Sequence, residues 1–162
     1  MIIAMTGTPG TGKTKFSQEL ANELGYKVMD VNAFIYAHQE VIIEYDKQKK
    51  TQVIDEDKLS SMIEKKLEMD KGANMIIDSH LSHYLSPDFI DICVVLKCDL
   101  KILKERLKKR GYHEQKIKDN LEAEAFDAIL TESEERHKKV VSFDTSSSPN
   151  VKKLLTEIKK SM

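Results

Sequence analysis

A phosphate-binding loop pattern, G-x-x-x-x-G-K-[ST], is present at residues 7–14 as the letters GTPGTGKT, and no other feature constrains the fold as strongly. Its glycines let successive backbone N–H groups point inward at an anion, because glycine takes the required dihedral angles without a steric penalty. Lys13 adds a positive charge for the terminal phosphates, and the Thr14 hydroxyl is a ligand for Mg²⁺. The chain is therefore predicted to bind a nucleoside triphosphate.

The flanks of this pattern fit a loop that joins a strand to a helix. Residues 1–5 form a continuous apolar run, as expected of a buried parallel strand. After Lys13, apolar residues recur at helical spacing as far as Leu24, and Gly25 follows as a helix stop. An ordinary glycine-rich turn would not require both flanking elements, so we favour the phosphate-binding interpretation.

The composition indicates a single domain in a reducing compartment. A chain of 162 residues is long enough for one domain with a substantial core. Charged residues make up 33% and nearly cancel, to a net charge of −1, which argues against a nucleic-acid coat or a membrane-surface protein. No stretch approaches the roughly 20 apolar residues of a membrane span, and the loop begins too early for a signal peptide to precede it. Cys93 and Cys98 lack the further ligands of a zinc site, so we expect buried or half-buried free thiols and a cytoplasmic location.

Apolar strand-like runs alternate with amphipathic helices along the chain, which is typical of an α/β fold with a parallel sheet. The expected strands are Ile2–Met5, Tyr26–Met29, Met75–Ile77, Ile92–Leu96 and Val140–Phe143. We therefore predict the three-layer sandwich of the P-loop NTPases, in which helices cover both faces of a central, parallel, five-stranded sheet.

Further helices are expected between and after these strands. Lys58–Met69 carries an apolar face, and Asp99 is expected to cap a helix that stops at Gly111. The run Glu114–Lys139 has the pattern of one amphipathic helix with a single core-facing side. Ser148-Pro149 fits the N-cap and first position of a last helix.

Two segments do not fit the alternating core. Residues 30–54 are too long for a simple connection, and residues 109–119 are basic, contain a glycine and lie between two expected helices. Insertions at these places in a phosphate-loop fold cover the nucleotide from opposite sides. We expect one domain over residues 1–162 with these two segments as its insertions.

The strand that ends at Asp78 supplies the next candidate site residues. A phosphate-loop enzyme needs a carboxylate opposite the Thr14 hydroxyl, to hold Mg²⁺ directly or through water, although Asp78 is alternatively a simple cap of the next segment. His80 follows two residues later, where an imidazole near the γ-phosphate can orient or deprotonate water. His83 is a weaker candidate, and three further histidines are expected at the surface: His38, His113 and His137.

Arginine occurs only three times in the chain, at Arg106, Arg110 and Arg136. Because arginine stabilises phosphate oxygens through its fork of donors, we expect Arg106, Arg110 or both to meet phosphate or to stack on the base. A solvated basic helix end is the alternative for this pair. Arg136 lies in a densely charged helical run and is expected to be solvated.

Taken together, these motifs resemble the adenylate kinase 6 family in its archaeal form. They are the loop GTPGTGKT, the strand end Asp78-Ser79-His80 and the run Arg106-Leu107-x-x-Arg110-Gly111-Tyr112. The loop alone is unspecific, but the second and third motifs at this separation are quite specific, and the similarity extends along the whole chain.

The resemblance implies an ATP-binding enzyme with adenylate kinase activity, ATP + AMP = 2 ADP, and with ATPase activity that uses Mg²⁺. It further implies a part in maturation of the small ribosomal subunit. The implied partner is a small-subunit ribosomal protein of the S11 class, which would connect the enzyme to the pre-ribosomal small subunit. Residues 30–54 would then be the monophosphate-binding flap and residues 109–119 the lid. We expect a cytoplasmic monomer with no membrane contact.

The resemblance also assigns site residues by position. The expected catalytic residues are Lys13, Asp78, His80 and Arg110, and the expected metal ligands are Thr14 and Asp78. The nucleotide contacts that it implies are Gly10, Gly12, Lys13, Thr14, Lys15 and Arg110, and Arg106 joins them as the second arginine that is expected to meet phosphate or the base.

One departure from a dedicated nucleotide kinase is that residues 30–54 contain no arginine to clamp the acceptor phosphate. Lys47, Lys49 and Lys50 are available there, but a lysine cannot form the bidentate fork. An ATP-switched ribosome-assembly factor with negligible kinase activity is therefore the alternative. A kinase of another small acceptor, such as shikimate or gluconate, is less favoured, since a carboxylate would also require cations in the flap.

Overall fold

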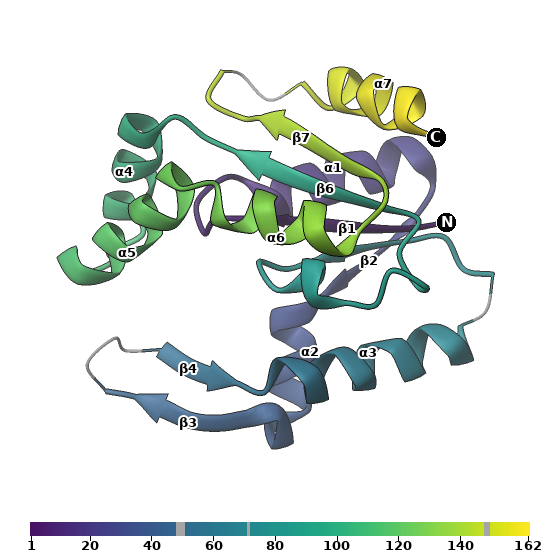
Figure 1. The fold of residues 1–162 in the computed structure, drawn as a ribbon, viewed down its shortest axis with the longest axis horizontal. Helices are drawn as coiled ribbons and strands as arrows, with labels where there is room; N and C mark the ends of the chain where they lie inside the picture. The colour runs from purple at the N-terminus through teal and green to yellow at the C-terminus, as the bar shows by residue number, and fades with distance from the viewer. Residues whose placement is uncertain (48–50, 71, 148–149) are drawn as a thin grey trace.

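A parallel five-stranded sheet forms the centre of the computed structural model, which describes residues 1–47, 51–70, 72–147 and 150–162. The strand order is β2-β5-β1-β6-β7 (Figure 1). The strands are β1 (Ile2–Gly7), β2 (Lys27–Asp30), β5 (Met75–Asp78), β6 (Ile92–Lys97) and β7 (Val140–Asp144). All five expected strands are confirmed, and they differ from the expectation only at their ends.

Helices cover both faces of this sheet, as Figure 1 shows. The α-helices are α1 (Lys13–Leu24), α2 (Val31–Ala37), α3 (Glu56–Met69), α4 (Leu100–Lys109), α5 (Glu114–Ala125), α6 (Ala128–Arg136) and α7 (Val151–Ser161), with short 3₁₀ turns at Gln39–Val41 and Ser82–Tyr84. None of the helices in the described ranges is both long and apolar enough to span a bilayer.

The two faces of the sheet bury separate hydrophobic cores. On β1, Ile3 and Met5 pack with α1 and α7, whereas Ala4 between them packs with α2 and α3 on the opposite face. Successive side chains of a strand point to opposite faces, so a strand covered on both sides must be apolar throughout. This arrangement confirms the predicted three-layer sandwich.

Residues 30–54 form more regular structure than the sequence indicated. Asp30 caps α2 through its side chain, which accepts hydrogen bonds from the backbone of Asn32 and Ala33. After the 3₁₀ turn, β3 (Ile42–Asp46) and β4 (Thr51–Ile54) pair as an antiparallel hairpin. In Figure 1 this hairpin extends away from the central sheet, on the same side of the molecule as α4 and α5.

Residues 109–119 contain a tight turn followed by the start of a helix. α4 ends at Lys109, α5 begins at Glu114, and Gly111 takes a positive φ of 73° in the turn that joins them. The Asp99 side chain caps α4 by accepting from the backbone of Lys101 and Ile102, as predicted.

The expectation of one helix over Glu114–Lys139 is wrong. The chain breaks between α5 and α6 at Asp127, whose φ of 53° makes it the one non-glycine residue of the described ranges with positive φ. The Asp127 carboxylate pairs with Lys97 at the end of β6, and this ion pair belongs to the tertiary structure rather than to the helical pattern. The apolar period continues through the break, which is why the sequence pattern does not reveal it.

Two further expectations concern the start of the last helix and the state of the cysteines. Ser148 and Pro149 lie outside the described residues, and the N-cap of α7 is Asn150, whose side chain accepts from the backbone of Lys153. Cys93 and Cys98 are free and buried, as predicted, and burial raises the pKa of the Cys93 thiol to about 12.

The break at Asp127 generates a stability prediction. Asp127→Val should be less stable than Asp127→Asn by about 1–2 kcal/mol. Both variants lose the charge beside Lys97, but asparagine tolerates the left-handed backbone conformation, whereas the β-branched valine is strongly disfavoured in it. Urea unfolding of the two variants measures the difference. Equal midpoints would show that the break does not depend on the backbone preference of residue 127.

Candidate functional site

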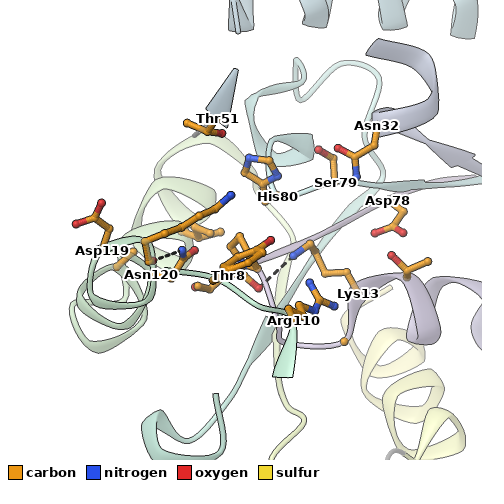
Figure 2. A pocket seen from close by; sticks show the side chains of 18 residues that line it. Thr8, Lys13, Asn32, Thr51, Asp78, Ser79, His80, Arg110, Asp119 and Asn120 are labelled. Carbon is orange, nitrogen blue, oxygen red and sulfur yellow. Dashed lines mark hydrogen bonds between the residues drawn. The ribbon is translucent and has the colours of Figure 1, made fainter. Parts of the chain in front are cut away.

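A cleft of about 530 Å³ opens at the carboxyl ends of the central strands, and Figure 2 shows the side chains that line it. The phosphate loop and the residues after β5 form one part of its wall. α2 and β4 contribute a second part, and the α4–α5 turn with α5 contributes a third. The lining residues are Thr8, Pro9, Gly10, Gly12, Lys13, Thr14, Asn32, Thr51, Asp78, Ser79, His80, Arg110, Tyr112, Lys116, Asp119, Asn120, Ala123 and Ile129.

The phosphate loop requires glycine at two points of close packing. Gly7 has a φ of 137°, and a Cβ there would lie 2.4 Å from the carbonyl oxygen of Leu96 on β6. Gly10 has a φ of 97°, and a Cβ there would lie 2.9 Å from Leu103 of α4. The loop is therefore held between β6 and α4, and only glycine fits both the backbone geometry and the space.

Lys13 lies across its own loop. Its Nζ donates hydrogen bonds to the carbonyl oxygens of Gly7 at 2.7 Å and Thr8 at 3.1 Å. Burial lowers the pKa of Lys13 to about 8, an effect that the nearby carboxylate of Asp78 opposes and the guanidinium of Arg110 reinforces. The ammonium is thus a partly desolvated cation at the mouth of the loop.

Arg106 braces the loop from the side of β7. Its guanidinium donates to the carbonyl oxygen of Thr145 at 2.8 Å and to that of Gly10 at 3.4 Å. The Thr145 hydroxyl in turn donates to the carbonyl oxygen of Thr11 at 2.7 Å. The expected contact of Arg106 with a nucleotide stays a prediction, whereas its hydrogen bond to the loop carbonyl of Gly10 is present in the structure.

Asp78 lies beside the helical end of the loop because β1 and β5 pair in register, with Met5 opposite Asp78. Only 5% of Asp78 is exposed, and burial raises the pKa of its carboxyl, although a hydrogen bond from Thr14 and the charge of Lys13 act in the opposite direction. The donor set of Asp78 and Thr14 fits Mg²⁺, which takes oxygen ligands and is usually held by one or two protein groups while water and phosphates complete its shell. No cluster of three or more acidic, histidine or cysteine side chains that could hold a metal occurs in the described ranges.

The His80 side chain lies in the cleft next to Ser79 (Figure 2). It is open to solvent, and its backbone carbonyl accepts a hydrogen bond from the Thr6 hydroxyl at 3.3 Å. Although the residue is exposed, the walls of the cleft remove part of the water around its imidazole. This partial desolvation and the charge of Lys13 lower the pKa of His80, so its imidazole is neutral near pH 7.

The remaining predicted contacts lie where the cleft meets a second cavity of about 380 Å³. Arg110 lines both spaces, whereas Arg106 and Lys15 line the second cavity only. Lys15 is exposed and pairs with Glu19 on the next turn of α1, at 3.8 Å. All the predicted site residues therefore line one or both of these adjoining spaces.

Sequence reasoning named no individual residue of the α5 wall of the cleft, although the expected lid at residues 109–119 includes the first part of α5. Lys116, Asn120 and Ala123 recur at intervals of three or four, and Asp119 lies next to Asn120, so they share one side of the helix. The Lys116 ammonium sits 4.3 Å from the centre of the Tyr112 ring, within cation–π range. The helical spacing of polar residues after the RGY run was the available signal. Asn32 and Thr51, on the α2–β4 wall, carried no such pattern.

His83 and His137 are buried beneath the site and not part of it, so the expected surface position of His137 is wrong. His83 Nδ1 lies 3.0 Å from the Thr6 hydroxyl, and His83 Nε2 lies 3.0 Å from a carboxylate oxygen of Glu132. His137 Nε2 lies 2.9 Å from the carbonyl oxygen of His83. Burial lowers the pKa of both imidazoles. His83 links β1 to α6, and His137 links the end of α6 to the 3₁₀ turn that contains His83.

Comparison with known proteins supports this geometry at the level of family and fold. Residues 3–127 match the family model described as AAA domain. A protein of Methanocaldococcus jannaschii named "Putative adenylate kinase" is 40% identical over 158 residues, which cover 98% of this chain and 84% of that protein. A protein of the same name from Thermococcus kodakarensis is 42% identical over 146 residues, 90% of this chain and 77% of its own length.

Solved structures share the fold at low sequence identity. Deoxyadenosine kinase from M. mycoides superposes with a TM-score of 0.59 at 21% identity and full coverage of both chains. Shikimate kinase from Bacteroides thetaiotaomicron superposes with a TM-score of 0.64 at 15% identity, covering 99% of this chain and 95% of that one. Such distant likeness establishes the fold alone. The two archaeal relatives establish more: the chain belongs to their protein family, as its resemblance to the adenylate kinase 6 family predicted.

Proposed function

We propose that this protein transfers the γ-phosphoryl group of ATP to AMP, forming two ADP, and that it also hydrolyses ATP. The observation that carries the proposal is one cleft in which the phosphate loop, Asp78 and His80 face the α2–β4 wall, which leaves a place for an acceptor opposite the donor. The name of the archaeal relatives and the kinase fold of the structural neighbours point the same way.

The donor half of the cleft is proposed to act by charge and positioning. Lys13 would exchange the carbonyl oxygens of Gly7 and Thr8 for β- and γ-phosphate oxygens, and Arg110 would meet the charge that spreads over the transferred group. Thr14 and Asp78 would hold Mg²⁺, which supplies positive charge to the phosphate oxygens when bound.

Transfer and hydrolysis make different demands on His80. In transfer, an oxygen of the AMP phosphate attacks the γ-phosphorus, and the bond to the bridging oxygen breaks with its electron pair leaving on ADP. That oxygen is already ionised, so no proton has to be removed. A water molecule must lose a proton when it attacks, and we propose that the neutral imidazole of His80, which lines the cleft, orients this water and accepts that proton.

The acceptor wall favours a second candidate, an ATPase that acts as a switch in assembly of the small ribosomal subunit. Asn32 and Thr51 are uncharged, and residues 30–54 contain no arginine to orient an acceptor phosphate. Of the three lysines in this segment, the structure describes Lys47, and Lys49 and Lys50 lie outside the described residues. Residues 30–54 as a flap and 109–119 as a lid are parts of this proposal, with an S11-class ribosomal protein as the candidate partner.

The two candidates separate in one assay. ADP formation is measured with ATP alone, with saturating AMP, with CMP, GMP or UMP in place of AMP, and with purified S11-class ribosomal protein. The proposal expects ADP formation to rise well above hydrolysis with AMP and less with the other monophosphates. Acceleration by the ribosomal protein alone, with none by AMP, would instead support the assembly switch.

Lys13→Ala should abolish nucleotide binding, because Lys13 is the cation built into the loop. The parent should gain about 2.7 kcal/mol of stability from Mg-ATP at 100 times its dissociation constant, and the variant should gain none. Thermal unfolding with and without Mg-ATP measures the gain, and Lys152→Ala on the exposed side of α7 is the matched control. A parent-like gain in Lys13→Ala would contradict the assignment of the loop.

His80→Ala should slow ATP hydrolysis by about 10²-fold or more while slowing transfer to AMP much less, because only the water nucleophile needs a base. Hydrolysis is followed as ADP release without AMP, and transfer as the AMP-dependent increment. Lys152→Ala, on the exposed side of α7, again serves as the control. Equal losses in both reactions would mean that His80 acts on the phosphate or on the fold and not on water.

A further inference from the structure

Glu124 is a buried carboxylate that lies next to the phosphate loop but does not line the cleft. It is 5% exposed and occupies the last turn of α5. An ionised side chain at such a depth is costly unless hydrogen bonds and an opposite charge compensate for the lost water. Its partners therefore indicate what the position is built for.

Both carboxylate oxygens of Glu124 are occupied. One accepts a hydrogen bond from the Thr8 hydroxyl at 2.5 Å, and the other accepts from the backbone N–H of Cys98 at 2.8 Å. Lys97 supplies the balancing charge, with its Nζ at 3.3 Å from the second oxygen. Lys97 also donates to the backbone carbonyl of Glu124 at 3.0 Å and pairs with Asp127, which fixes the end of α5 to the end of β6.

Thr8 connects this carboxylate to the centre of the loop. The carbonyl oxygen of Thr8 accepts from Lys13 Nζ at 3.1 Å and from the backbone and hydroxyl of Thr11, at 3.2 and 2.8 Å. The same residue thus holds the loop cation through its backbone and Glu124 through its side chain. A displacement of Glu124 would be transmitted to the residue on which Lys13 rests.

The other end of α5 reaches the cleft. Asn120 lines it one turn before Glu124 and Lys116 two turns before, and Lys116 lies about 12 Å from Glu124 along the helix axis at about 1.5 Å per residue. Because α5 is a continuous helix from Glu114 to Ala125, its cleft wall and its anchored end move together.

We propose that Glu124 is a positioning residue that couples the phosphate loop to the α5 wall of the cleft. Phosphate bound in the loop fixes Thr8, Thr8 fixes Glu124, and Glu124 fixes the helix that carries Lys116 and Asn120. If an ordered α5 raises the affinity of the loop for phosphate, then phosphate in the loop stabilises the ordered α5 by the same free energy, by thermodynamic linkage. The inference rests on the nucleotide binding of the proposed function, and it does not depend on which acceptor the enzyme uses.

The test uses Thr8→Val, which removes the hydroxyl at nearly constant size, and Thr8→Ser, which keeps it. Glu124→Gln removes the charge, and Glu122→Gln makes the same change at an exposed position of α5 whose described partner is Lys118. Each protein is titrated with the magnesium complex of a non-hydrolysable ATP analogue. Amide hydrogen exchange of residues 114–125 is then measured with and without the analogue.

Thr8→Val and Glu124→Gln should each weaken analogue binding by about tenfold, the order of effect of one buried hydrogen bond to a charged group. Both should lose the analogue-induced protection of α5, whereas Thr8→Ser and Glu122→Gln keep it. The double variant Thr8→Val with Glu124→Gln should bind no more than about twofold more weakly than either single variant. Thr8→Val removes the donor of the link and Glu124→Gln removes the charge of its acceptor, so both changes act on the same link.

Parent-like affinity and parent-like protection of α5 in Thr8→Val would overturn the inference. If Glu124→Gln does not fold, the two Thr8 variants still decide it, because they leave Glu124, Cys98 and Lys97 in place. Failure of the parent itself to bind the analogue would overturn the proposed function and the coupling with it. A parent that binds while α5 exchange is indifferent to the analogue overturns the coupling alone.

Discussion

The register of β1 between β5 and β6 is the constraint on which the rest of the site depends. Met5 lies opposite Asp78, and Gly7 lies opposite Leu96, so the start of the loop, the β5 carboxylate and the end of β6 meet at one edge. A slip of one residue would exchange the two faces of β1 and move its apolar side chains out of their cores. Burial on both faces therefore fixes this register, and the register brings the phosphate loop and Asp78 to the same edge of the sheet.

The sequence predicted the structure best where local patterns and tertiary packing agree. The three central strands, β5, β1 and β6, are buried on both faces and are therefore largely apolar, and that property is visible in the sequence itself. The β3–β4 hairpin was missed because its strands pair with each other and leave Ile43 and Tyr45 more than half exposed, so no burial pattern distinguishes them. The break at Asp127 was missed because an ion pair with a distant strand, and not the helical period, accompanies it.

The site residues that were predicted stand in short local motifs, whereas Glu124, which was missed, depends on partners far away in the sequence. Lys13, Thr14 and Asp78 stand in short motifs at strand ends, where parallel strands bring them together by topology alone. Glu124 lies 116 positions from Thr8, its partner, and nothing local distinguishes it from its exposed neighbour Glu122. A buried acid on an amphipathic helix is recognised only when the fold shows which face it occupies.

The packing around the loop gives it a conformation that its glycines alone would not hold. Glycine loses more backbone entropy on ordering than any other residue, so a loop with three glycines needs compensating contacts. Arg106 binds the Gly10 carbonyl, Leu103 packs beneath Gly10, and Glu124 holds Thr8. The opposite wall comes from α2, which packs into the core on one face of the sheet, and from a hairpin that shares no strand pairing with the central sheet in the described residues. The contacts of Arg106, Leu103 and Glu124 with the loop involve neither α2 nor the hairpin, so the sequence of that wall can change without removing these contacts.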